Sequence, residues 1–219
     1  MNILFDGPEQ GPLCIFAHGA GAPMDSGFME TFTKGLSNQG IRVARFEFPY
    51  MQERRENGKK RPPNRQPELL ACLDEVIAEI GEPGVLIGKS MGGRMSSIAA
   101  SSFQSEAGVN SLISGVCAIG YPFHPQGKPE KLRVDHLSDV SVPMSVIQGT
   151  RDPLGNQELV SELITQNQVP LSMSILWLED GDHDLKPRKK SGHTHDAHIK
   201  EAIEYCASFI KFCYSSRNK

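Results

Sequence analysis

The sequence predicts an α/β fold: a mainly parallel central sheet with helices on both faces. Short apolar segments alternate along the 219 residues with longer segments of helical periodicity, a pattern typical of repeated strand–helix units. Several apolar segments contain no polar alternation, as expected for strands covered on both faces. No repeat and no interdomain linker is visible, so we expect residues 1–219 to form a single domain.

Six segments have strand character because they are short, apolar and bounded by Gly, Pro or polar clusters. In chain order they are Leu13–Ala17, Ile41–Phe48, Gly84–Gly88, Gly115–Gly120, Met144–Gln148 and Ser172–Leu178.

Five further segments place apolar residues at helical spacing. They are Gly27–Asn38, Pro67–Ile80, Met91–Ser102, Asn156–Gln166 and His195–Phe212. Pro67 suits a first helical turn, where its missing N–H has no partner to lose. Two connections, Pro49–Gln66 and Tyr121–Pro143, are longer than usual for a compact domain, and each is expected to be irregular.

Composition excludes several classes of protein. The 23 basic and 26 acidic residues give a net charge of −3, so nucleic acid is not expected as a partner. The five cysteines have no metal-binding or redox spacing, and their odd number suits a reducing compartment. No signal peptide or membrane-length apolar run is visible, so we expect a soluble cytoplasmic protein with no membrane partner. The sequence leaves the oligomeric state open.

The most informative motif is Gly88-Lys89-Ser90-Met91-Gly92. It follows the apolar strand and precedes a helix of small residues, which is the context of a nucleophile elbow. In such a turn the serine hydroxyl is raised toward substrate, and the flanking glycines avoid backbone collisions. The motif predicts Ser90 as a nucleophile.

A serine hydroxyl needs a base and a group that orients the base, and on this kind of sheet the chain order is Ser, then Asp or Glu, then His. Asp152 follows the strand Met144–Gln148, and His183 follows the strand Ser172–Leu178. Taken singly, Asp152 could be a turn residue before Pro and His183 a solvated loop residue. Their joint placement after successive strands predicts Asp152 as the acid and His183 as the base. Asp182 and Asp184 are alternative acids, but each adjoins His183, so reaching the far imidazole nitrogen is awkward.

The first strong strand runs into His18-Gly19-Ala20-Gly21-Ala22, which resembles the loop that donates an oxyanion N–H in lipases and esterases. We assign this N–H to Ala20, with Gly19 or Gly21 as neighbouring alternatives, and a second N–H to Met91. His18 precedes the serine and is expected to orient the loop.

Three aromatic residues follow another strand end and could line a substrate pocket, or could equally pack beneath their loop. They are Tyr121, Phe123 and His124. The basic segment 49–66 could attract anionic substrates or could be a solvated loop.

Two weaker patterns have simpler explanations. Gly88-Lys89-Ser90 resembles the end of a phosphate-binding loop, but position 83 is Pro where that loop needs Gly. A cluster near the last helix could ligate a metal, but no strand-anchored partner accompanies it, and a solvated polar entry to the helix is the favoured interpretation. Its members are His193, His195, Asp196 and His198. No cofactor or metal is therefore expected.

The chain resembles the α/β-hydrolase superfamily, through His18-Gly19, the Gly88–Gly92 motif, Asp152 and His183. Within it, the chain is similar to the compact capless group called dienelactone-hydrolase-like. More narrowly it resembles small bacterial proteins related to testis-expressed hydrolase-like proteins. The segments that carry the narrower resemblance are Phe48–Met51, Gly120–Pro125 and Gly149–Pro153. The resemblance implies the fold and a Ser-Asp-His triad. Dienelactone hydrolases use cysteine where this chain has Ser90, so lactone cleavage is not implied.

We therefore expect a serine hydrolase that cleaves a carboxylic ester or thioester of a small soluble substrate through an acyl-enzyme. Two alternatives stay open. One is a non-catalytic domain of the same fold used for binding, because a fold does not determine function. The other is an acyltransferase or haloperoxidase on the same scaffold.

Overall fold

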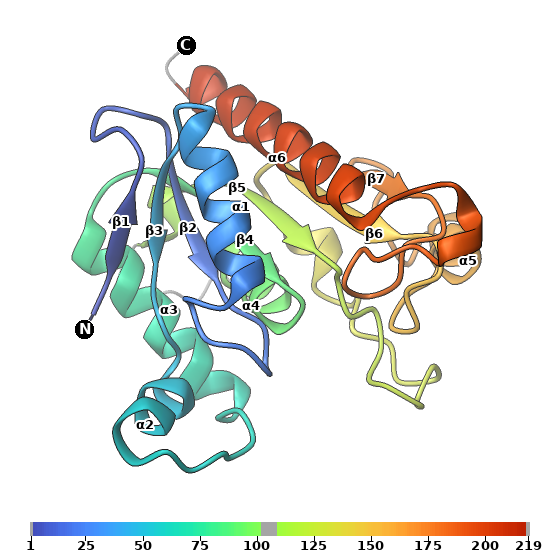
Figure 1. Cartoon of the computed structure of the whole chain (residues 1–219), viewed down its shortest axis with the longest axis horizontal. Helices are drawn as coiled ribbons and strands as arrows, with labels where there is room; N and C mark the ends of the chain where they lie inside the picture. The colour runs from blue at the N-terminus through green and yellow to red at the C-terminus, as the bar shows by residue number, and fades with distance from the viewer. Residues whose placement is uncertain (1, 102–108, 218–219) are drawn as a thin grey trace.

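Within residues 2–101 and 109–217, which the computed structural model describes, seven strands form one sheet in the order β1-β3-β2-β4-β5-β6-β7 (Figure 1). Their bounds are β1 Leu4–Asp6, β2 Leu13–Ala17, β3 Arg42–Arg45, β4 Gly84–Lys89, β5 Ile113–Ile119, β6 Met144–Gly149 and β7 Ser174–Leu178. β1 is antiparallel to β3, and the other pairings are parallel. The carboxyl ends of β2 and of β4 to β7 therefore meet at one edge of the sheet, where open α/β sheets bind ligands.

Helices cover both faces of this sheet. Their bounds are α1 Gly27–Asn38, α2 Pro49–Asn57, α3 Gln66–Ile80, α4 Met91–Ser101, α5 Gln157–Thr165 and α6 His195–Arg217. α1 and α6 pack on the face nearer the viewer in Figure 1, and the other helices pack on the opposite face. Short 3₁₀ turns occur at Val109–Leu112, Leu137–Asp139 and Lys189–Ser191. The described residues include no large cap domain over the carboxyl ends of the strands.

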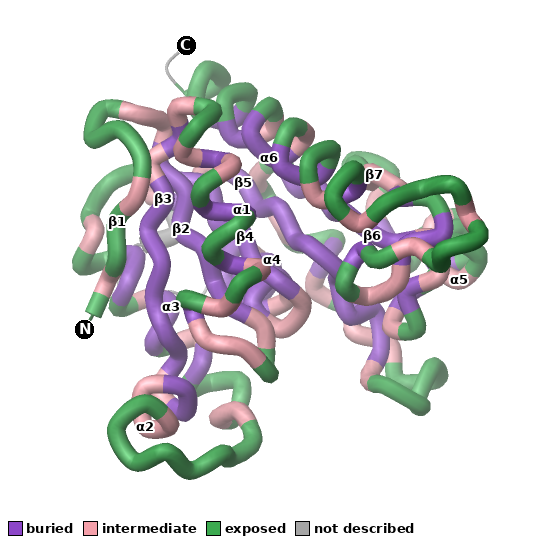
Figure 2. The backbone as a smooth tube through the Cα atoms, in the orientation of Figure 1, coloured by how far each residue is buried: buried purple, intermediate pink, exposed green. Residues whose placement is uncertain are grey.

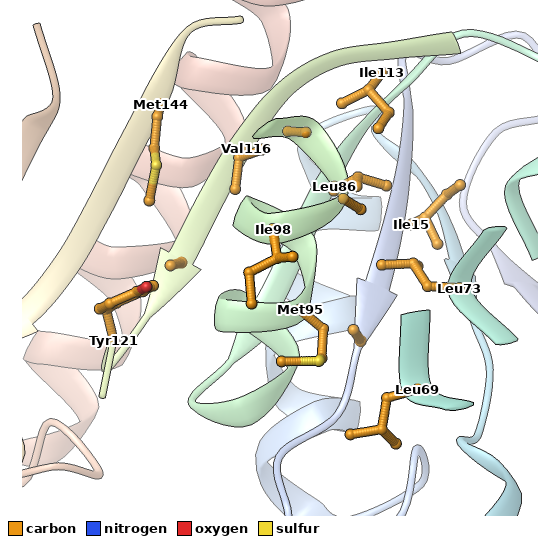
Figure 3. Packing of buried hydrophobic residues seen from close by; sticks show 14 of the residues in the cluster. Ile15, Leu69, Leu73, Leu86, Met95, Ile98, Ile113, Val116, Tyr121 and Met144 are labelled. Atoms are coloured by element: carbon orange, nitrogen blue, oxygen red, sulfur yellow. The ribbon is translucent and has the colours of Figure 1, made fainter. Parts of the chain in front are cut away.

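Two apolar cores result, because successive strand residues point to opposite faces. In β4, Ile87 contributes to the core beneath α1 and α6, while its neighbour Leu86 contributes to the core beneath α3 and α4. Figure 3 shows Leu86 in this second core, with Met95 and Ile98 of α4 close by. In Figure 2 the central strands are buried along their length, whereas buried and exposed residues alternate along the surrounding helices.

The predicted fold class is confirmed. The strands predicted at Leu13–Ala17, Gly84–Gly88 and Met144–Gln148 agree with β2, β4 and β6 to within one residue. The strand predicted over 41–48 is wrong at its end: β3 stops at Arg45, and the next three residues are buried outside the ladder. The last residue of the predicted helix Met91–Ser102 lies outside the described residues.

The expectation of an irregular segment over 49–66 is wrong for its first half. Pro49 occupies the first turn of α2, where it costs no hydrogen bond, and left-handed Gly58 ends the helix. Tyr50 and Met51 are its buried residues, and the residues that follow them in the helix are polar, so the sequence shows no apolar repeat at helical spacing. None of the helices in the described ranges is long and apolar enough to span a bilayer.

Candidate active site

Ser90 lies in a sharp turn between β4 and α4, with a left-handed φ of 51°. A side chain at Gly88 would clash with the backbone of Gly92 and Gly93, and one at Gly92 would clash with the backbone of Ala17. The Ser90 N–H donates to the carbonyl oxygen of Ile119 in β5 at 2.8 Å, which fixes the turn to the sheet. The strained serine and its two glycines are thus consequences of the same close packing.

The structure brings together the three residues predicted as nucleophile, base and acid. His183 Nε2 lies 2.9 Å from Ser90 Oγ, and His183 Nδ1 lies 2.8 Å from Asp152 Oδ2. Because the carboxylate accepts, the neutral imidazole carries its proton on Nδ1 and leaves Nε2 free to accept the serine proton. Asp182 and Asp184, the alternative acids, are not hydrogen-bonded to this imidazole; the Asp182 carboxylate instead accepts from the N–H groups of Asp184 and Lys186.

Asp152 is fully buried after β6, and its two oxygens have defined partners. Oδ1 accepts from the Leu154 N–H at 2.8 Å, and Oδ2 lies 3.0 Å from the side-chain amide nitrogen of Gln148. Gln148 also accepts from the Tyr121 N–H through its carbonyl oxygen at 2.7 Å. Gln148 was not predicted from the sequence as part of the site. The feature that could have indicated it is a side-chain amide near the end of a mostly apolar strand.

Lys89, the residue before the nucleophile, was also missed as part of the site. Its side chain is almost buried, and Nζ donates to the carbonyl oxygen of His183 at 2.7 Å. The Asp184 carboxylate lies 3.3 Å from Nζ. Burial lowers the pKa of the Lys89 ammonium, and the charge of Asp184 opposes this shift. The signal was a lysine at the end of a buried strand, where an unpaired charge would be costly.

The loop between β7 and His183 is anchored by Asp180. Its carboxylate accepts from the backbone N–H of Arg188 at 2.7 Å and from the Arg188 guanidinium, and Arg151 lies 3.0 Å from the same carboxylate. The hydrogen bond from Arg188 is the largest cause of the lowered pKa of Asp180. The Asp180 N–H donates to Thr150 Oγ1 at 2.8 Å, so the loop that carries His183 is tied to the loop that carries Asp152.

The loop after β2 also faces Ser90. Ala20 lines a cavity with Ser90, and the Met91 N–H belongs to the first turn of α4, where amide groups have no intrahelical acceptor. His18 is buried; its Nδ1 lies 2.7 Å from the Gly19 carbonyl oxygen, and its Nε2 accepts from the Phe48 N–H at 3.1 Å. Burial lowers the pKa of His18, so the ring stays neutral and ties this loop to the chain before α2.

Ser90 and His183 line a cavity of about 300 Å³. Lys89 and Asp184 add charge to its wall, while Phe28 and Met29 of α1 make an apolar side. The residues that line it are Gly19, Ala20, Gly21, Ala22, Ser26, Phe28, Met29, Lys89, Ser90, His183 and Asp184.

The three aromatic residues predicted to line the substrate pocket are not among the lining residues of this cavity. Tyr121 and Phe123 are fully buried and pack edge to face at 4.9 Å, and the Tyr121 hydroxyl donates to the Arg133 carbonyl oxygen at 2.8 Å. His124 is almost buried, with Nδ1 2.8 Å from the Pro125 carbonyl oxygen. This is the packing arrangement that the sequence left as the alternative.

Two of the four candidate metal ligands near α6 have hydrogen-bond partners within the protein. His195 Nε2 lies 3.0 Å from the Asp184 carbonyl oxygen, and buried His198 places Nδ1 2.9 Å from the Leu185 carbonyl oxygen. In the part of the chain that the structure describes, no group of three or more His, Cys, Asp or Glu side chains gathers as metal ligands do. Of the six basic residues in 49–66, Arg55 pairs with Glu47 and Asp25, and Arg61 pairs with Glu53.

A mainly parallel sheet in which one strand runs through a left-handed serine into a helix, with histidine and aspartate at later strand ends, is the architecture of α/β hydrolases. The sequence pattern of the alpha/beta hydrolase domain matches residues 10–211, so the chain belongs to this family.

Solved structures share the fold at low sequence identity. The esterase domain of a Rhodothermus marinus protein is 19% identical, covering 94% of this chain and 89% of that chain, with a TM-score of 0.63. A monoacylglycerol lipase from Paleococcus ferrophilus is 16% identical, covering 94% and 98%, with a TM-score of 0.68. A dienelactone hydrolase from Anabaena variabilis is 15% identical, covering 93% and 90%, with a TM-score of 0.66. The chain is thus similar in fold to the compact group that its motifs resemble.

Proposed function

We propose that this α/β hydrolase is a serine hydrolase that cleaves a carboxylic ester or thioester of a small soluble substrate. The observation that carries the proposal is the series of hydrogen bonds from Ser90 Oγ through His183 to buried Asp152. This series activates a hydroxyl that is otherwise a weak nucleophile. The esterase and lipase among the structures of similar fold support the reaction class.

In the proposed mechanism, Ser90 Oγ attacks the acyl carbonyl carbon while His183 Nε2 accepts the hydroxyl proton. Asp152 stabilises the resulting imidazolium, and the N–H groups of Ala20 and Met91 donate to the developing oxyanion. Collapse of the tetrahedral intermediate breaks the bond to the alcohol or thiol, which takes the proton from His183. Water then attacks the acyl-enzyme and gives its proton to His183. The bond between the acyl carbon and Ser90 Oγ breaks, Oγ takes the proton from His183, and the acid leaves.

The volume of the Ser90 cavity supports a small substrate. A volume of about 300 Å³ lies at the lower end of the range for small-molecule sites. The five cysteines are all free and buried, which supports the proposal that the enzyme acts in the reducing cytoplasm.

The test uses a fluorophosphonate probe and a panel of p-nitrophenyl esters and acyl-CoA thioesters. Wild-type protein should form a covalent adduct on Ser90 and hydrolyse at least one member of the panel. Ser90→Ala should form no adduct and should lose at least about 10³-fold in kcat, because removal of the nucleophile disables the whole series.

Two other results would contradict the proposal. Folded wild-type protein without an adduct would favour the non-catalytic binding domain. Transfer of most of the acyl group to an added alcohol or to peroxide, rather than to water, would favour an acyltransferase or haloperoxidase.

A further inference from the structure

A second and larger cavity lies between α1 and α6, two helices that lie side by side on one face of the sheet (Figure 1). Its volume is about 660 Å³, within the range of small-molecule binding sites. We call it the α1/α6 groove; its lining residues are Gly27, Phe28, Thr31, Lys34, Gly35, Asn38, Gln39, His195, Asp196, Ile199, Lys200, Ile203 and Glu204.

The groove adjoins the cavity that contains Ser90. Phe28 lines both spaces and forms a common wall. Asp184 also lines the Ser90 cavity, and its carbonyl oxygen lies 3.0 Å from Nε2 of His195, which lines the groove. A molecule held at Ser90 therefore has the groove as its neighbouring space.

The lining of the groove is apolar in its depth and charged at its rim. Phe28, Ile199 and Ile203 supply the apolar surface, and Ile203 is almost buried. A side chain at Gly35 would clash with Ile203, so the two helices meet closely there and close the floor. The exposed lysines Lys34 and Lys200 stand among the lining residues, and long charged side chains of this kind commonly border apolar surface.

We propose that the α1/α6 groove binds an unbranched alkyl arm of the ester substrate while its carbonyl group lies at Ser90. The arm belongs either to the acyl group or to the alcohol. The inference rests on the proposed hydrolase function and adds to it a substrate class, namely esters with one extended apolar arm. Phe28 borders both spaces, and this favours a substrate arm over a separate partner, because an alkyl chain that leaves the Ser90 cavity along this ring would reach the groove.

The experiment measures kcat/KM over two series of esters. p-Nitrophenyl esters from acetate to octanoate lengthen the acyl arm, and alkyl acetates from ethyl to octyl lengthen the alcohol arm. In wild-type protein, kcat/KM should rise in one series by up to about fourfold for each methylene that leaves water, which is the gain expected from burial of a methylene. The series that shows the rise identifies the arm.

Two variants fill the groove from opposite helices. Thr31→Trp acts from α1 and Lys200→Trp from α6, and both residues are exposed and line the groove. Each should abolish the rise with chain length while leaving acetate hydrolysis within about twofold of wild type, because the first carbons lie in the Ser90 cavity. The matched controls are Glu30→Trp and Glu201→Trp, whose positions are adjacent, exposed and outside the lining. They should keep the wild-type profile.

The outcomes separate this inference from the proposed function. Chain-length profiles that are flat, or identical in all five proteins, overturn the groove proposal. The groove would then be assigned to a protein partner instead. Acetate hydrolysis and labelling of Ser90 would then still support the serine hydrolase. Absence of both activities in folded wild-type protein overturns the two proposals together.

Discussion

Lys89 places an ammonium group in the wall of the cavity that Ser90 also lines. Removing a charge from water is costly unless hydrogen bonds and an opposite charge compensate. Here the His183 carbonyl oxygen and the Asp184 carboxylate provide both. The lysine therefore contacts the backbone of the residue whose imidazole faces Ser90, and we infer that it positions this histidine.

Lys89→Met keeps the apolar stem and removes the ammonium. We expect kcat for a p-nitrophenyl ester to fall by roughly 10- to 100-fold with a smaller change in KM, because a small displacement of a base is costly in rate. Steady-state kinetics and a melting curve would separate this effect from a loss of stability.

Asp184→Asn is the matched control for Lys89→Met, because it removes the charge partner and leaves the hydrogen bond to the His183 carbonyl oxygen. Its effect on kcat should be smaller. An unchanged kcat in Lys89→Met would show that the ammonium has no positioning role.

The loops after β6 and β7 behave as one unit because Asp180 joins them. Its carboxylate contacts Arg188 and Arg151, and its N–H contacts Thr150. Asp152 and His183 lie within three residues of these contacts, so their relative position depends on the junction. The left-handed φ of 57° at Asp180 is a strained conformation that these contacts hold in place.

Asp180→Asn tests this junction through the pH dependence of stability. A carboxyl group with a lowered folded-state pKa stabilises the fold above its ordinary pKa near 4, and this contribution is lost as pH falls through the lower folded value. Asp180→Asn should therefore melt at a lower temperature than wild type at pH 7, and the difference should shrink at pH 3. The neighbouring exposed variant Glu179→Gln should match wild type at both values. A pH-independent difference would rule out the ionised carboxylate as its cause.

The elements that carry the site could be predicted because each strand is an apolar run with a clear boundary. Ser90, Asp152 and His183 follow such strands, so chain order and strand ends were sufficient to find them. Lys89 and Gln148 are visible as polar residues in apolar strands, but Lys89 bonds to a residue 94 positions away. Such contacts depend on sheet order, which periodicity does not encode. β1 was missed because it is short and mostly exposed.

One partly buried titratable group, His136, lies outside the site, beside the helix α4. His136 Nε2 lies 2.8 Å from Ser97 Oγ of α4. Burial is the largest cause of a pKa lowered to about 4, and the charge of Arg94 adds to it, whereas Asp135 and Asp139 oppose it. The folded protein therefore keeps this histidine neutral at pH values where the unfolded chain binds a proton.

Stability should consequently fall in mild acid. The unfolded histidine takes up its proton near pH 6.5 and the folded one near pH 4, so the loss develops as pH falls between these values. Gln does not titrate, so the free energy of unfolding of His136→Gln should fall less than that of wild type between pH 7 and pH 4. The difference should be roughly 2 to 3 kcal/mol, in proportion to the pKa difference. Urea denaturation at several pH values measures this, and parallel curves for the two proteins would refute it.

The hydrogen bond between Ser90 and His183 spans 93 positions and needs β4 to β7 in their final order. A partly folded chain in which β4, α4 and β5 have assembled but β7 has not docked holds a Ser90 hydroxyl without its base. Under the proposed mechanism, the number of molecules that react rapidly with a fluorophosphonate equals the number whose last third has docked. Labelling of Ser90 would thus report the fraction of molecules that have completed folding during refolding or synthesis.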